Sequence, residues 1–194
     1  DMYHQGDGAF TGEVSGAMLR DCGVQTVLCG HSERRHVMGE KDELVNKKLR
    51  AALEAGLDAV LCVGETLDER EAGHQDIITS RQVRTGLAEI PGTLAERLII
   101  AYEPVWAIGT GKTATPDDAQ AAHAQIRNLL DRMYGKDVAN RVRIVYGGSL
   151  KPDIAGAIFA EPDVDGGLVG GASLSAADFV AICKLAAASA RAGG

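Results

Sequence analysis

Apolar runs of strand length alternate with segments of helical periodicity along most of the chain. The runs with an extended pattern are 24–29, 57–63, 98–101, 142–146 and 164–169. Alternation of this kind predicts parallel strands joined by helices that pack against the sheet. The pattern therefore predicts an α/β fold with about five β-α units. By strand count alone, an open doubly wound sheet is favoured.

The helical segments between these runs carry marked ends. Residues 43–55 place apolar side chains on a helical period, and Gly56 follows as a C-terminal cap. Thr115 as N-cap and Pro116 at the first helical position begin a helix that we expect to end at Gly135. The last two helices are expected to open at 151–153 and 173–177.

Composition places the chain among ordinary globular proteins. With 194 residues, 45% hydrophobic and 24% charged, we expect a single domain over 1–194, with 187–194 as a flexible tail. The net charge of -7 disfavours nucleic acid and anionic membrane surfaces as partners, but leaves room for a small-anion pocket. No apolar run approaches the roughly 20 residues that a membrane span needs. We expect no metal site.

The cysteines predict a reducing environment. Cys22, Cys29, Cys62 and Cys183 show no C-x-x-C spacing, and two of them lie in apolar, strand-like runs. We therefore expect reduced core residues in a cytoplasmic protein.

The segment 101–113 has the features of a gated active site. Glu103 follows an apolar strand, Pro104 restricts the backbone around it, and Gly109 and Gly111 allow the intervening segment to swing as a lid. The end of this segment matches the phosphate-loop pattern G-x-x-x-x-G-K-[ST], but the first glycine of that pattern would fall on Trp106. We therefore expect no nucleotide loop here, and we expect Trp106 to anchor the lid by packing.

Acid–base chemistry has candidates at two strand ends. His31 and Glu103 are the residue types needed to polarise a carbonyl and to abstract a neighbouring proton. The alternative for a histidine after a strand is a capping or packing role. Glycine pairs at 147–148 and 170–171 predict either a cradle of backbone amides for an anion or simple turns. Glu33, with Arg34 and Arg35 beside it, either supports the site or belongs to a solvated charge cluster.

Several longer motifs together resemble the triosephosphate isomerase family over nearly the whole chain. These motifs are 8–13, 30–35, 101–114, 146–149 and 165–173. The resemblance implies the eight-stranded (β/α)8 barrel and interconversion of dihydroxyacetone phosphate and glyceraldehyde 3-phosphate, a glycolytic and gluconeogenic step. It also implies a cytoplasmic homodimer without a cofactor. It implies, further, a neutral histidine as the electrophile and a loop that closes over the substrate.

The resemblance also implies roles for single residues. Glu103 would be the base and His31 the neutral electrophile, with Glu33 as a supporting carboxylate. Thr11 would lie in an interface loop that reaches the neighbouring subunit. The residues implied to bind the substrate phosphate through the backbone are Gly109, Ser149, Gly170 and Gly171.

The resemblance implies further N-terminal sequence before position 1. Barrels of this type run to about 250 residues, and the resemblance implies that strands one to three, with the family's Asn and Lys, precede position 1. That segment would belong to the same polypeptide, or be supplied as a separate N-terminal segment, or be absent from a true fragment. Two functional alternatives stay open. One is an inactive or complementation-dependent fragment that binds phosphate or a partner without turnover, and the other is a different phosphosugar enzyme on an open sheet.

Overall fold

A computed structural model describes residues 1–108 and 112–192, with side chains as far as 189. Its centre is one sheet of four parallel strands. The strands are β1 (Thr26–Cys29), β2 (Asp58–Val63), β3 (Leu98–Tyr102) and β4 (Arg143–Tyr146). They lie side by side in chain order, β1-β2-β3-β4, and each falls within or next to an apolar run of the sequence.

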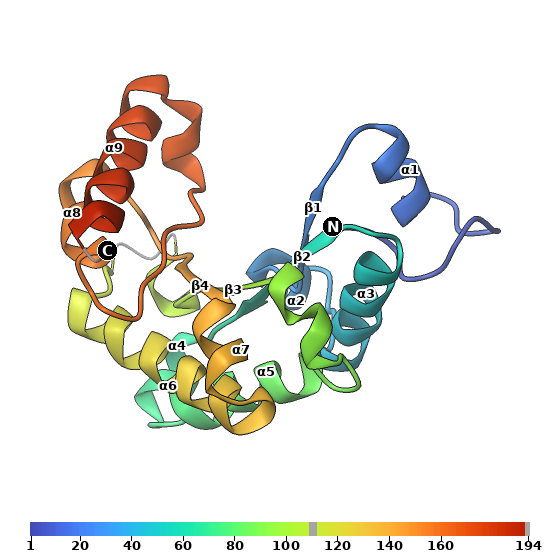
Figure 1. Ribbon diagram of the computed structural model, residues 1–194, viewed down its shortest axis with the longest axis horizontal. Coiled ribbons are helices and arrows are strands. Elements are labelled where there is room, and N and C mark those ends of the chain that lie inside the picture. Colours follow the sequence, from blue (N-terminus) through green and yellow to red (C-terminus); the bar gives the residue numbers. More distant parts are fainter. Residues whose placement is uncertain (109–111, 193–194) are drawn as a thin grey trace.

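The order of the strands decides between the two predicted architectures. A doubly wound sheet reverses its strand order and carries helices on both faces. Within the described residues the order does not reverse, and α3 (Asp42–Glu54), α5 (Gln75–Gly86) and α6 (Pro116–Tyr134) cover one face of the sheet (Figure 1). The expectation of an open doubly wound sheet from strand count is therefore wrong, and the arrangement is that of a barrel segment.

The prediction that residues 164–169 form a full fifth strand is wrong. Residues 164–169 run parallel to β4, with Asp165 N–H donating to the Ile144 carbonyl and Leu168 N–H to the Tyr146 carbonyl. Only one isolated bridge forms, between Tyr146 and Gly167. Gly166 has a φ of 154°, outside the strand region, and glycines add no side chain to pack, so the ladder is interrupted.

The predicted helix ends are confirmed in detail. Helix α3 ends at Glu54, and Gly56 follows with a φ of 81°. Thr115 caps α6 through a reciprocal capping box with Asp118, and the helix stops at Gly135. The other helical elements are α1 (Gly16–Asp21), α2 (Ser32–His36), α4 (Leu67–Glu71), α7 (Lys136–Arg141), α8 (Pro152–Phe159), α9 (Ala176–Ala192), η1 (Gly92–Arg97), η2 (Val105–Ala107) and η3 (Gly171–Leu174).

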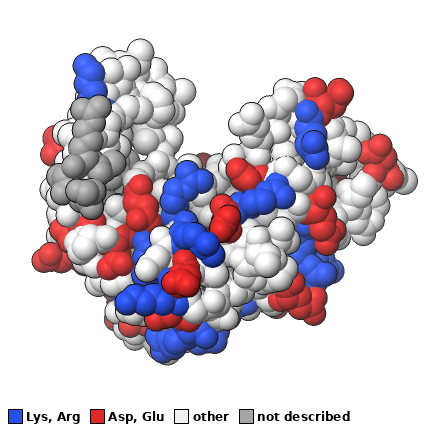
Figure 2. All heavy atoms as spheres, in the orientation of Figure 1, with Lys and Arg blue, Asp and Glu red and all other residues white. Residues whose placement is uncertain are grey.

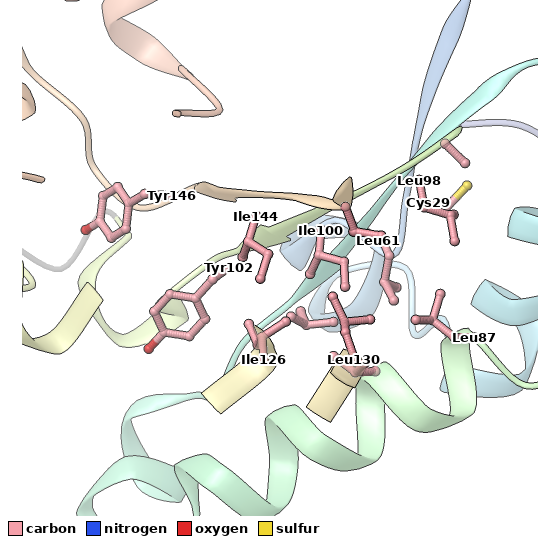
Figure 3. Close-up of a cluster of buried hydrophobic side chains, with 14 of the residues drawn as sticks. Cys29, Leu61, Leu87, Leu98, Ile100, Tyr102, Ile126, Leu130, Ile144 and Tyr146 are labelled. Atoms are coloured by element: carbon pink, nitrogen blue, oxygen red, sulfur yellow. The ribbon is translucent and has the colours of Figure 1, made fainter. Parts of the chain in front are cut away.

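The main core lies between the sheet and the helices that cover it. Strand residues Leu61, Ile100 and Ile144 point toward Ile126 and Leu130 of α6 (Figure 3). The opposite face of the sheet carries a smaller buried cluster of Val60, Cys62 and Ala101. Successive strand side chains alternate between the two faces, so both faces of β2 and β3 are apolar.

The cysteines divide between core and surface. Cys29 and Cys62 are buried, and burial raises the pKa of the Cys29 thiol to about 12. Cys22 and Cys183 are exposed, so the prediction that all four are core residues is wrong for these two. Cys22 is the C-cap of α1, and Cys183 lies at an exposed position of α9. Neither belongs to a strand of the buried sheet.

Candidate active site

One cavity of about 820 Å³ opens at the carboxyl ends of the strands. Figure 2 shows the hollow between the limb that carries α8 and α9 and the rest of the molecule. Parallel α/β folds bind ligands at this edge, because the connecting loops there come together from several strands. Lining residues include His31, Glu33, Glu103, Ser149, Gly170 and Gly171.

Glu103 is held inside this cavity by two hydrogen bonds. It directly follows β3 and is only 2% exposed. Oε1 lies 3.0 Å from Nε2 of His31, and Oε2 accepts a hydrogen bond of 2.9 Å from the backbone N–H of Ser32. Both carboxylate oxygens are therefore engaged, and the predicted acid–base pair meets in one cavity.

The tautomer of His31 follows from its place at the start of α2. Its Nδ1 accepts a hydrogen bond of 3.3 Å from the Glu33 N–H, which leaves Nε2 as the nitrogen that carries the proton toward Glu103. The hydrogen bond to Glu103 raises the pKa of His31, and partial burial opposes that shift. In the neutral form, the ring therefore presents an N–H donor to the cavity.

Arg35, with a side chain that is only 7% exposed, fixes the turn that carries His31. Gly30 has a φ of 74°, which a side chain tolerates poorly. Arg35 donates a hydrogen bond of 2.7 Å to the Gly30 carbonyl and one of 3.1 Å to the Cys62 carbonyl. It also forms an ion pair with Asp42. The sequence alone left this arginine between a solvated cluster and a support, and its contacts show that it supports the turn.

Glu33 lies farther from the chemistry. Its side chain is 82% exposed, and Oε2 is 4.0 Å from Nδ1 of His31. Its supporting role stays a prediction.

Two glycine-rich turns form the opposite wall. A Cβ on Gly148 would lie 2.2 Å from the Tyr146 hydroxyl, so the turn requires glycine there. The N–H groups of Gly148, Ser149 and Gly171 have no hydrogen-bond acceptor among the described residues. A Cβ on Gly170 or Gly171 would meet nothing within 4 Å, so the backbone at these glycines is open to a ligand.

The base of the predicted lid is anchored by a buried carboxylate. Trp106 is 7% exposed, in agreement with its predicted packing role, and its Nε1–H donates 2.8 Å to Glu65. Glu65 also accepts from Tyr102 and Arg70, and the Arg70 guanidinium lies 4.2 Å from the centre of the Trp106 ring. Gly109 lies outside the described residues.

Thr11 lies apart from the cavity within this chain. It is exposed and does not line the cavity, and it belongs to a loop in which the Tyr3 and Phe10 rings lie 4.7 Å apart. Its predicted contact with a neighbouring subunit stays a prediction.

Among the residues with described side chains, no group of three or more His, Cys, Asp or Glu is arranged to hold a metal ion. In the same part of the chain, no helix has the length and apolar character needed to cross a membrane.

Comparison with known proteins decides the family. The family model described as triosephosphate isomerase matches residues 1–186. The chain belongs to the triosephosphate isomerase family. It is 56% identical over 184 residues to the triosephosphate isomerase of Carboxydothermus hydrogenoformans, covering 95% of this chain and 73% of that protein. It is 53% identical over 187 residues to that of Syntrophotalea carbinolica, with 96% and 74% covered.

Membership of the triosephosphate isomerase family confirms the (β/α)8 barrel class that the motifs implied. The chain is also 55% identical over 184 residues to the triosephosphate isomerase of Treponema pallidum. That match covers 95% of this chain and 74% of that protein. Sequence reasoning missed two contributors to the site: the Ser32 amide, which donates to Glu103, and Lys151, which lines the cavity. No local pattern marks either, because a backbone N–H carries no residue preference and an exposed lysine is common.

Proposed function

We propose that this chain carries the acid–base centre of a triosephosphate isomerase, which interconverts dihydroxyacetone phosphate and glyceraldehyde 3-phosphate in glycolysis and gluconeogenesis. The observation that carries the proposal is the approach of His31 Nε2 to Glu103 Oε1, at 3.0 Å, inside the cavity. Relatives that bear this enzyme's name are 52–56% identical, which supports the substrate class.

The roles follow from the hydrogen bonds. Glu103 is only 2% exposed, so its carboxylate acts in a site from which water is largely excluded. Substrate entry places a carbonyl oxygen at His31, whose Nε2–H turns from Glu103 to that oxygen. Glu103 then takes the proton from the hydroxyl-bearing carbon beside the carbonyl and returns it to the former carbonyl carbon. His31 Nε2 gives a proton to the carbonyl oxygen and takes one from the neighbouring hydroxyl, which stabilises the enediolate and completes the exchange of protons between the two oxygens.

The phosphate is bound by backbone amides. Ser149 and Gly171 line the cavity from the two turns, and their N–H groups have no acceptor among the described residues. Gly109 and Gly170 complete the proposed set. Ser149 Oγ donates a hydrogen bond of 3.1 Å to the Ala107 carbonyl. The turn that contains Ser149 therefore contacts the base of the lid directly. Closure of the lid on bound phosphate then excludes water from the enediolate.

The working form is proposed to be a cytoplasmic homodimer without a cofactor. The exposed loop around Thr11 supplies the interface, with Thr11 reaching the partner's cavity. The free cysteines support a reducing compartment.

The test is conversion of glyceraldehyde 3-phosphate to dihydroxyacetone phosphate by the purified 194-residue chain, beside its Glu103→Gln variant. We expect turnover that disappears in the variant. Equal turnover in both proteins would contradict the assignment of the base. Binding of a phosphate-bearing enediolate mimic without turnover would favour a phosphate-binding chain that is not an enzyme.

A further inference from the structure

The side chains around the cavity carry an unfavourable charge for a phosphate ester. Four carboxylates line it among the described residues: Glu33, Glu103, Asp153 and Asp178. The whole chain, with these four carboxylates included, carries a net charge of -7. A phosphate dianion that approaches this opening is repelled, and nearby low-dielectric walls strengthen the repulsion. Neutral glycine amides hold a phosphate once it arrives, but they attract it only over short distances.

Lys151 is the one lysine or arginine among the described residues that line this cavity. It follows the Ser149 turn and is the N-cap of α8, where its side chain makes no capping hydrogen bond. It is exposed and forms no ion pair within the described part of the chain. Its positive charge is therefore not cancelled by a fixed partner.

A comparison with Lys48 shows what a structural lysine looks like in this fold. Lys48 is 1% exposed, and its ammonium lies 2.6 Å from carboxylate oxygens of both Asp1 and Glu40. Burial and pairing commit that lysine to packing. Lys151 has neither feature, so the fold does not need its charge.

We propose that Lys151 is an electrostatic steering residue that draws the substrate's phosphate past the carboxylates and onto the amides of Ser149 and Gly171. The proposal rests on the triose phosphate substrate proposed above. Because a solvated, exposed ammonium acts over a distance and is screened by salt, it changes the rate of association more than the chemical step. Lys151 is thus a residue for capture, separate from Glu103 and His31.

The test compares inorganic phosphate binding to the full chain and to Lys151→Met by calorimetry, at about 10 mM and about 500 mM salt. We expect binding to weaken by about 3- to 10-fold at low salt, and by less than about 2-fold at high salt. Lys151→Arg should keep the parent's affinity. Lys136→Met is the matched control, because Lys136 is also exposed but begins α7, before β4 and away from the cavity.

A parent chain that binds phosphate no better than Lys151→Met at low salt overturns the proposal, as does an equal loss in Lys136→Met. The same proteins are assayed with glyceraldehyde 3-phosphate, where we expect kcat/KM to fall with the same salt dependence while kcat stays unchanged. The phosphate titration needs no turnover, so failure of the isomerase assignment, read from Glu103→Gln, is distinguishable from failure of the steering role.

Discussion

The backbone of Glu103 packs directly against Gly64 at the end of β2. A Cβ on Gly64 would lie 1.7 Å from the Glu103 carbonyl oxygen, far inside any van der Waals contact. Because β2 lies between β1 and β3, a bare glycine at its end lets Glu103 from β3 reach His31, which follows β1. The acid–base pair therefore depends on a residue that has no side chain.

Gly64→Ala should displace Glu103 and impair catalysis strongly. A misplacement of about 1 Å costs on the order of 100-fold in rate, and we expect a loss of kcat of at least that size, with lower stability. Gly92→Ala is the control, because its Cβ would meet only Tyr134 and Val138, at 3.6 and 3.8 Å. Near-parent kcat in Gly64→Ala would show that the close packing is not needed.

Glu103→Asp should keep the charge but withdraw the carboxylate by one methylene. The base would then lie too far from the substrate carbon, and we expect kcat to fall by about 100-fold or more while KM changes little. Glu96→Asp makes the same chemical change at a side chain that is 60% exposed and remote from the cavity. Similar kinetics in the two variants would remove Glu103 from the base role.

The Trp106–Glu65 hydrogen bond should be measurable as a coupling energy. A hydrogen bond to a charged group contributes about 1.5–3 kcal/mol, and both side chains are buried. We expect a double-mutant cycle of Trp106→Phe and Glu65→Gln in urea unfolding to give a coupling of about 1 kcal/mol or more. Additive losses would mean that Trp106 is held by packing alone.

His123 should make the protein acid-sensitive. It is fully buried, and burial lowers its pKa from 6.5 to about 4, because the charged ring loses its hydration. The unfolded chain binds that proton first, so stability present above pH 6.5 is lost as the pH falls toward 4. Between pH 7 and 4.5 this contributes a loss of about 2–3 kcal/mol in the free energy of unfolding.

The measurement is urea unfolding of the parent and His123→Leu across that pH range. Whatever its stability at pH 7, the variant should lose less on acidification, by about 2–3 kcal/mol. Parallel pH curves for the two proteins would show that other groups cause the acid loss. The groups that face the ring are the Asp163 carbonyl, with which Nδ1 shares a hydrogen bond of 3.2 Å, Tyr102, Arg127 and Asp165.

Local pattern was sufficient for most element boundaries. The capping residues around α3 and α6 act on the adjacent turn, and a short apolar run bounded by turn residues favours a buried strand, so neighbours in sequence decide these features. The same reasoning overestimated 164–169, where the glycine backbone conformation that interrupts the ladder is not visible in an apolar pattern.

The sequence by itself determined the alternation of strands and helices, the residue types His31 and Glu103 at strand ends, and the motifs of the triosephosphate isomerase family. Only the tertiary structure decided the strand order, the hydrogen bond from the Ser32 N–H to Glu103, and the position of the unpaired Lys151 charge beside the cavity. The reason is physical. Periodicity and capping reflect contacts within a few residues, whereas these features arise where segments far apart in the chain are brought together by packing of the core.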